Sequence, residues 1–212
     1  MPRAALVSEK SMFENIREDL RTYEGKLSAQ GFWAMVTYRF GRWRYGVRPA
    51  LLRKPLSFAY RLLKTVTQVM AGIDLPCEAV VGRRFRIDHF GGVIVSGDAV
   101  FGDDCVIRNG VTIGLRRRDE PGSPVIGNRV DIGTGAKVLG PIHIGDDVVI
   151  GANAVVIRDV PAGSIAVGIP ARIIARKGYT QGVSFQDAPQ PAVIPNSASE
   201  TAELLVALQL SI

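Results

Sequence analysis

Between Leu75 and Pro161 an apolar residue recurs at every sixth position, and many of these residues are followed by glycine. Such a period is typical of a parallel β-helix, in which each six residues make one short strand and one turn, and three sixes make a triangular coil of about 18 residues. The apolar residue of each six points inward and stacks on its counterpart about 4.8 Å along the axis. These residues are therefore assigned to the core: Leu75, Val81, Ile87, Val95, Phe101, Ile107, Ile113, Ile126, Ile132, Val138, Ile144, Ile150 and Val156.

The period is interrupted twice. The step from Ile87 to Val95 is eight residues, which places a two-residue insertion within Asp88–Gly92. The step from Ile113 to Ile126 is thirteen residues, which predicts a loop from Leu115 to Val125. Departures from a solenoid repeat mark loops that often lie on the binding face, so the chemistry is expected near these two interruptions.

The sequence before the repeat predicts three helices. The first covers Ser11–Glu24, with Ser11 and Glu14 spaced as a capping box, and the second covers Gly31–Tyr45. The third covers Leu56–Met70 after Pro49 and Pro55, and its residues Leu62, Leu63, Val66, Val69 and Met70 are available for burial. The predicted organisation is mainly β: a helical segment over 1–72, a β-helix over 73–177, and a flexible tail with a short helix over 178–212.

The formal net charge of +6 is unevenly distributed, because no acidic residue occurs from Gly25 to Ile73 while nine basic residues do. Such a block suits an anionic membrane surface, a phosphorylated substrate or nucleic acid, or it forms a solvated helical face. No zinc-finger, RNP-type or helix-turn-helix signal supports nucleic acid. No signal peptide or run of 18 uncharged apolar residues is present, so a cytoplasmic location is expected, with peripheral membrane contact through the basic helices as an option. Cys77 and Cys105 are predicted to be buried structural thiols.

Only two histidines occur, at positions 89 and 143. His143 immediately precedes an inward residue in a regular six and is expected at the surface. His89 lies in the two-residue insertion beside Gly91 and Gly92, which permit close approach of a ligand. Imidazole is the usual general base near neutral pH, and a carboxylate such as Asp74, nearly one coil earlier, would fix its tautomer. His89 is therefore the candidate catalytic base.

The motifs around these residues resemble the serine acetyltransferase branch of the hexapeptide acyltransferases over about residues 31 to 172. The matching runs are Gly72-Ile73-Asp74, Ile87-Asp88-His89, Val111-Thr112-Ile113-Gly114, the six residues 135–140 and Val167-Gly168-Ile169-Pro170-Ala171-Arg172. The resemblance implies a left-handed β-helix, a homotrimer that can pair into a dimer of trimers, and acetyl-CoA bound as co-substrate between neighbouring β-helices. No metal is implied, since a metal-dependent hydratase of β-helix type needs three histidines.

The resemblance also implies roles for individual residues. His89 matches the catalytic base, Asp74 the carboxylate paired with it, and Asp88 a residue that binds the acceptor. The positions that match the coenzyme channel are Gly114, Thr134, Gly135, Ala152 and Arg172. The implied reaction is direct acetyl transfer, in which His89 deprotonates an acceptor hydroxyl and returns the proton to the coenzyme thiol.

The chain departs from this family in the loop after Gly114. Gly122 and Ser123 stand where the family has the arginine and histidine that hold the amino-acid carboxylate. Arg116, Arg117 and Arg118 are candidate replacements, and Glu24 is the nearest match to a further acceptor-binding acid. The lost donors favour an acetyltransferase acting on a sugar or polysaccharide hydroxyl, with serine O-acetylation as the alternative. A non-enzymatic trimerisation scaffold is disfavoured by the retained His89 and Asp74.

Overall fold

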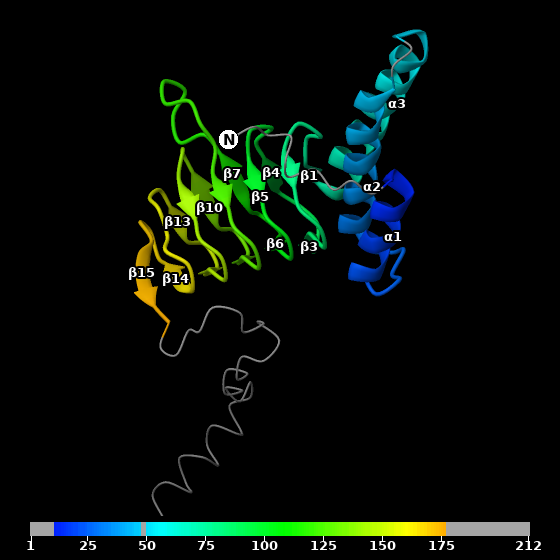
Figure 1. Cartoon of the computed structure of the whole chain (residues 1–212). Coiled ribbons are helices and arrows are strands. Elements are labelled where there is room, and N and C mark those ends of the chain that lie inside the picture. The colour runs from blue at the N-terminus through cyan, green and yellow to red at the C-terminus, as the bar shows by residue number, and fades with distance from the viewer. Residues whose placement is uncertain (1–10, 48–49, 177–212) are drawn as a thin grey trace, which may run out of the picture. The chain divides into compact units, whose positions relative to one another are not determined.

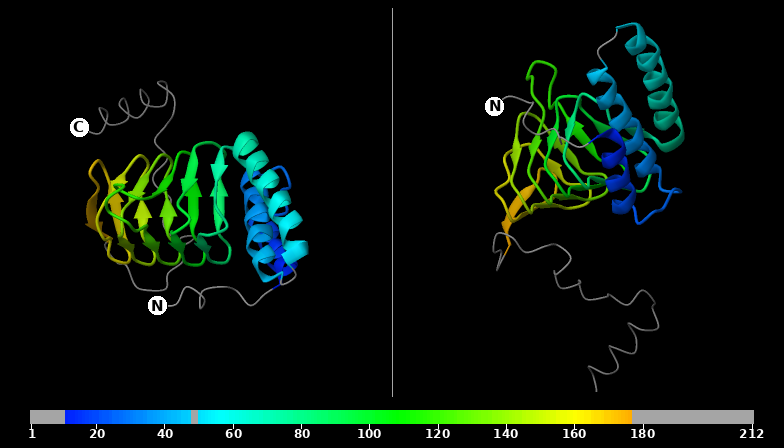
Figure 2. Two further views of the ribbon diagram at one scale, coloured as in Figure 1. Left: turned by 90° about the horizontal axis from the view of Figure 1, so that it is seen from above. Right: turned by 45° about the vertical axis from the view of Figure 1, so that its right-hand side comes forward.

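The computed structural model describes residues 11–47 and 50–176 and consists of three helices followed by a parallel β-helix (Figure 1). The helices are α1 (Met12–Thr22), α2 (Gln30–Trp43) and α3 (Ala50–Ala71), with a 3-10 turn η2 (Arg44–Gly46) after α2. They stand together at the end of the β-helix where its first coil begins (Figures 1 and 2). This order confirms the predicted fold class. The tail predicted over 178–212 lies outside the described residues.

The β-helix is built from fifteen short strands, which stack into three sheets of five, four and six strands. All pairings are parallel except the last, in which β14 and β15 pair antiparallel. The strands are β1 (Ile73–Asp74), β2 (Val80–Val81), β3 (Arg86–Asp88), β4 (Val93–Val95), β5 (Val100–Phe101), β6 (Val106–Arg108), β7 (Thr112–Gly114), β8 (Val125–Ile126), β9 (Asp131–Ile132), β10 (Lys137–Leu139), β11 (His143–Ile144), β12 (Val149–Ile150), β13 (Val155–Val156), β14 (Ser164–Val167) and β15 (Arg172–Ala175).

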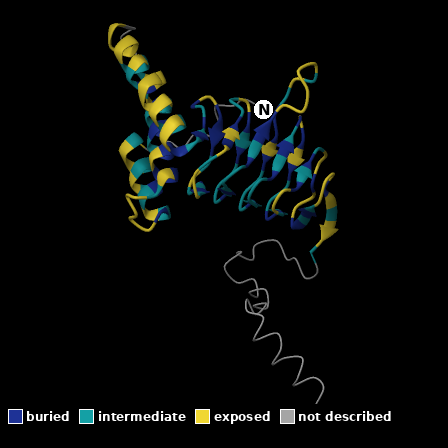
Figure 3. Ribbon diagram, turned by 180° about the vertical axis from the view of Figure 1, so that it is seen from behind, coloured by how far each residue is buried: buried dark blue, intermediate teal, exposed yellow. Residues whose placement is uncertain are grey.

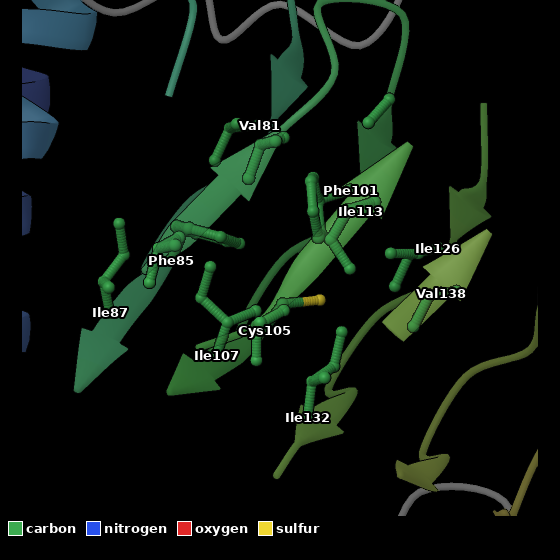
Figure 4. Close-up of a cluster of buried hydrophobic side chains, with 14 of the residues drawn as sticks. Val81, Phe85, Ile87, Phe101, Cys105, Ile107, Ile113, Ile126, Ile132 and Val138 are labelled. Atoms are coloured by element: carbon green, nitrogen blue, oxygen red, sulfur yellow. The ribbon is translucent and has the colours of Figure 1, made fainter. Parts of the chain in front are cut away.

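All thirteen inward positions predicted from the repeat are buried. Figure 4 shows how residues from successive coils, such as Ile87, Ile107 and Ile132, stack along the interior. The two cysteines are free and buried, as predicted. The core is therefore a column of apolar side chains that has no catalytic or ligand-binding groups. Functional residues are expected on the outside of the coils or at their corners.

The first two helices are fixed to the first coil by buried polar contacts. The predicted capping box of α1 is present, with Ser11 and Glu14 bonded reciprocally. Arg39 in α2 forms a bidentate ion pair with Asp19 in α1, at 2.9 and 3.1 Å, and both side chains are buried. The hydroxyl of Tyr38 accepts from Val81 N–H at 3.1 Å and donates to a carbonyl of the same coil. These contacts hold α1 and α2 in one orientation relative to β2 and β3.

The third helix differs from its prediction in two respects. It begins at Ala50 rather than Leu56, and Pro55 lies inside it. The missing N–H of Pro55 would have donated to Leu51 near the exposed start of the helix, so its loss is tolerated there. The five apolar residues expected to be available for burial are instead exposed (Figure 3). Only the opposite face of α3, which includes Tyr60, packs on α2 and on the first coil.

Candidate functional site

His89 lies at a corner of the first coil, in the connection between β3 and β4. It adopts a left-handed backbone conformation, with φ of 65°, and its side chain is exposed. The corner is held by Gly91, whose N–H donates to Ala71 O at 2.8 Å and whose carbonyl accepts from Gly110 N–H at 2.8 Å. A Cβ on Gly72 would lie 2.9 Å from the Cα of Gly91, so glycine is needed for this close approach. The two-residue insertion thus presents His89 to solvent on a firmly bonded turn.

Asp74 belongs to the neighbouring strand at the same corner. Val93 N–H donates to Gly72 O at 3.1 Å, which brings the start of β1 beside the end of the His89 turn. The carboxylate oxygen Oδ1 of Asp74 lies 3.1 Å from Lys64 Nζ on α3 but makes no hydrogen bond of good geometry. Within the described part of the chain no ion pair or hydrogen bond joins His89 to Asp74. Catalytic hydrogen bonds are often long in unliganded enzymes and shorten in the reactive complex.

A small pocket of about 80 Å³ opens beside His89. Its lining residues are Tyr23, Lys26, Ala29, Gln30, Gly31, Arg86, Ile87, Asp88 and His89. It forms where the turn between α1 and α2 meets β3, because Ile87 N–H donates to Tyr23 Oη at 2.8 Å. Burial raises the pKa of Tyr23 well above its usual range, so this hydroxyl stays neutral.

Charges of both signs lie in and around this pocket. Asp88 Oδ1 accepts from Arg86 Nε at 2.5 Å. Arg86 also lies 4.0 Å from Glu24, which pairs with Lys26 at 2.6 Å; the hydrogen bond from Lys26 holds the pKa of Glu24 below its usual value. Two cations and two carboxylates therefore stand within reach of one another. The sequence analysis did not single out Arg86 or Lys26, since neither belongs to a motif.

Three of the predicted coenzyme-channel residues lie along the same corner as His89. The corner is continued by Gly110, then by Gly135, whose N–H donates to Asn109 O at 2.9 Å. Next comes Asn153, whose N–H donates to Thr134 O at 2.8 Å, with Ala152 exposed beside it. At about 4.8 Å for each coil, Gly135 is about 10 Å from the His89 turn.

One cation that the sequence analysis missed also lies on this corner. Lys137 Nζ donates to Gly110 O at 2.5 Å and to Thr112 Oγ1 at 3.0 Å. The other two predicted channel residues lie off the corner. Gly114 ends β7, farther along its sheet, and Arg172 begins β15, beyond the last regular coil. The corner therefore forms a row that leads from His89 toward the far end of the solenoid.

The loop predicted from Leu115 to Val125 leaves the coil over 115–124, since Val125 already begins β8, and it is visible as a protruding hairpin in Figure 1. Arg116 forms a bidentate pair with Glu120, and Arg117 and Arg118 are exposed. Ser123 donates to Ser96 Oγ at 2.8 Å, and a Cβ on Gly122 would lie 2.7 Å from Pro141. The two residues that replace the expected arginine and histidine therefore pack the base of the loop against the coil.

His143 is exposed, as predicted. Among residues 11–47 and 50–176, no group of three histidine, cysteine, aspartate or glutamate side chains is arranged to hold a metal ion. In the same residues no helix has the length and apolar character needed to cross a bilayer.

Several known proteins with similar sequences are described as serine acetyltransferases. Residues 123–158 match the family described as bacterial transferase hexapeptide (six repeats). A serine acetyltransferase of Helicobacter pylori is 40% identical over 155 residues, which cover 73% of this chain and 86% of the relative. A serine acetyltransferase of Synechococcus elongatus is 40% identical over 149 residues, which cover 70% of this chain and 58% of the relative. The chain thus spans less than two thirds of the length of the Synechococcus protein.

Solved structures of serine acetyltransferases are similar to this chain in their fold. The serine acetyltransferase of Brucella abortus strain S19, in complex with coenzyme A, superposes with a TM-score of 0.67 at 29% identity. The match covers 79% of this chain and 69% of that protein, so it includes helices as well as coils.

Proposed function

Because the chain belongs to the serine acetyltransferase family of hexapeptide-repeat acyltransferases, we propose that it transfers the acetyl group of acetyl-CoA to the hydroxyl of serine. This replaces the order of preference that the sequence suggested, in which a sugar hydroxyl came first. The relatives favour serine, and the pocket beside His89 is the observation that carries the proposal.

The size of the pocket suits a small acceptor. At about 80 Å³ the pocket is far smaller than the about 300–1,000 Å³ of pockets that take drug-sized ligands. A sugar joined to a nucleotide or a lipid phosphate would have to lie mostly outside it. The surrounding charges suit a zwitterion, because Asp88 and Glu24 are acceptors for an ammonium group while Arg86 and Lys26 are donors for a carboxylate. In this proposal Arg86 binds the carboxylate of serine, in place of the loop arginine and histidine that the family uses and that are Gly122 and Ser123 here.

The mechanism follows from these positions. His89 takes the proton of the serine hydroxyl, and the resulting alkoxide attacks the thioester carbonyl of acetyl-CoA. The C–S bond breaks, and His89 returns the proton to the coenzyme thiolate, so no acyl-enzyme forms. Asp74 orients the imidazole by accepting its other N–H. The corner that carries Thr134, Gly135 and Ala152 is the proposed path of the coenzyme, with Gly114 and Arg172 at its borders.

The coenzyme path also supports an oligomer. The corner runs along the outside of one chain, where Thr134 and Gly135 are half-buried and Ala152 is exposed. A second chain packed along it would enclose the coenzyme on its other side. We therefore propose a homotrimer in which each groove lies between two β-helices. Light scattering that gives the mass of a single chain at assay concentrations would contradict this part.

The first test is the release of free CoA thiol from acetyl-CoA with L-serine as the only acceptor. Release that depends on serine supports the proposal. The variant His89→Asn should lower kcat by about 10²–10⁴-fold, and asparagine is chosen because it tolerates the positive φ at this position better than alanine. A His89→Asn protein with wild-type turnover would show that the assigned base is wrong.

The acceptor site has its own test. Arg86→Met should raise KM for serine about 10–100-fold, because a hydrogen bond to a charged group is lost. Arg83→Met is the matched control, since Arg83 lies in the same coil and pairs with Asp103 on an exposed surface. If Arg116→Gln raises KM for serine and Arg86→Met does not, the carboxylate is held by the loop.

A sugar acceptor remains the second candidate, for one specific reason. Gly122 and Ser123 supply no charged group at the two loop positions where the family has an arginine and a histidine. Thiol release with a nucleotide-sugar or glycan pool, and none with serine, would favour this candidate.

A further inference from the structure

The outward face of α3 carries a continuous apolar stripe. Leu51, Pro55, Phe58, Leu62, Val66 and Val69 follow one another at intervals of three or four residues and so share one side of the helix. Leu51 is 83% exposed, Phe58 72% and Val69 76%. Leu52, Leu63 and Met70 widen the stripe on one side, and all three are exposed. At about 1.5 Å for each residue, the stripe from Leu51 to Val69 extends over about 27 Å of α3.

The stripe is held outward by the packing of the opposite face. Tyr60 is buried, and its hydroxyl accepts from Cys77 N–H at 3.1 Å on the first coil. Thr67 shares a hydrogen bond of 3.1 Å with Thr37 on α2. Because these contacts fix the rotation of the helix, the apolar side cannot turn inward without breaking them. Figure 3 shows this side of α3 as exposed along most of its length.

The charges beside the stripe are all positive. At 100° per residue, Lys54 and Arg61 project along one border of the stripe. No acidic residue occurs between Gly25 and Ile73, so neither the helix nor its neighbours α2 and η2 offer a carboxylate to balance them. An apolar face bordered by lysine and arginine is the pattern of helices that lie in the plane of a membrane interface.

We propose that α3 docks in the plane of a bilayer surface that carries anionic lipids. Its apolar stripe enters the boundary between headgroups and acyl chains, while Lys54 and Arg61 contact the lipid phosphates. A second copy of the chain is the other occupant to consider. A symmetric contact between two α3 stripes would bring like charges together with no carboxylate from this segment to pair them, which disfavours it.

The test is sedimentation of the full chain with two kinds of vesicle, phosphatidylcholine alone and phosphatidylcholine mixed with phosphatidylglycerol. The wild type should bind the mixed vesicles and lose affinity as salt is raised, because the attraction is screened. Phe58→Ser with Leu62→Ser should weaken binding about a hundred-fold. Lys54→Gln with Arg61→Gln should weaken binding to the mixed vesicles about thirty-fold.

Two matched controls lie on α1. Phe13→Ser removes an aromatic side chain that is 76% exposed, and Arg17→Gln with Arg21→Gln removes two exposed charges; both proteins should bind as the wild type does. Wild-type protein that fails to bind the mixed vesicles overturns the proposal. So does undiminished binding by Phe58→Ser with Leu62→Ser. If that variant instead changes the mass in light scattering while vesicle binding is unaffected, the stripe is a contact between copies.

Discussion

The buried ion pair between Asp19 and Arg39 gives a stability prediction with a calculable size. Asp19 is 1% exposed, and Arg39 donates to both of its oxygens and to Gly82 O at 3.2 Å. Removing one partner leaves the other charge buried without its counter-ion, which costs about 3–5 kcal/mol. For a unit of this size that corresponds to a fall in Tm of about 10 °C.

The assay is urea unfolding of Asp19→Asn, Arg39→Met and the double variant. Each single variant should lose about 3–5 kcal/mol of unfolding free energy, whereas the double variant should lose less than the sum of the two, because no lone charge remains. Losses below about 1 kcal/mol for both single variants, or strict additivity, would refute the reasoning. The pair matters for function because it fixes α1, whose end supplies Tyr23 to the pocket beside His89.

Three further predictions follow from the coils and the corner. Ile132→Ala should lower the unfolding free energy by about 2–5 kcal/mol in chemical denaturation, since it opens a cavity in the stacked core. Burial raises the pKa of the Cys105 thiol from its ordinary value of 9.0 to about 12, so its contribution to stability is complete below pH 9 and is lost as pH rises toward 12. Unfolding across that range should show Cys105→Ala losing less stability with pH than the wild type. Lys64→Met removes the cation 3.1 Å from Asp74 and leaves this carboxylate to the His89 imidazole, so steady-state kinetics should give a kcat/KM for serine at or above the wild-type value.

The fold was predictable because every coil repeats the same pattern, a buried apolar residue at every sixth position. Ile107, Ile132 and Ile150 are interchangeable members of one pattern, and thirteen repetitions leave little room for another interpretation. The capping box at Ser11 and the position of His89 could also be predicted from the sequence. The first follows from the spacing of Ser11 and Glu14, and the second from the interruption of the six-residue repeat. Each of these signals lies within a few residues of sequence.

What the sequence did not reveal depends on contacts between distant segments. Arg86 becomes part of a pocket only because Tyr23, 64 residues earlier than Ile87, bonds to the same strand. The apolar residues of α3 carry the pattern of a buried face, and no local feature says that the partner covering them is absent from the described chain. The amphipathic pattern shows which side of a helix is apolar, whereas tertiary packing decides what covers that side.

The placement of the site at the first coil has a physical reason. The row of turns that begins at His89 repeats similar backbone hydrogen bonds at Gly110, Gly135 and Asn153, about 4.8 Å farther along for each coil. Among residues 11–47 and 50–176, helices pack only against the first coil, so in this part of the chain only there can a turn such as Tyr23–Gly31 close a pocket over a corner residue. A variant that loses this turn should therefore retain the proposed coenzyme row at Thr134 and Gly135 and lose the proposed acceptor site. In the proposed mechanism, the acceptor and the coenzyme are therefore bound by separate parts of the chain that meet at His89.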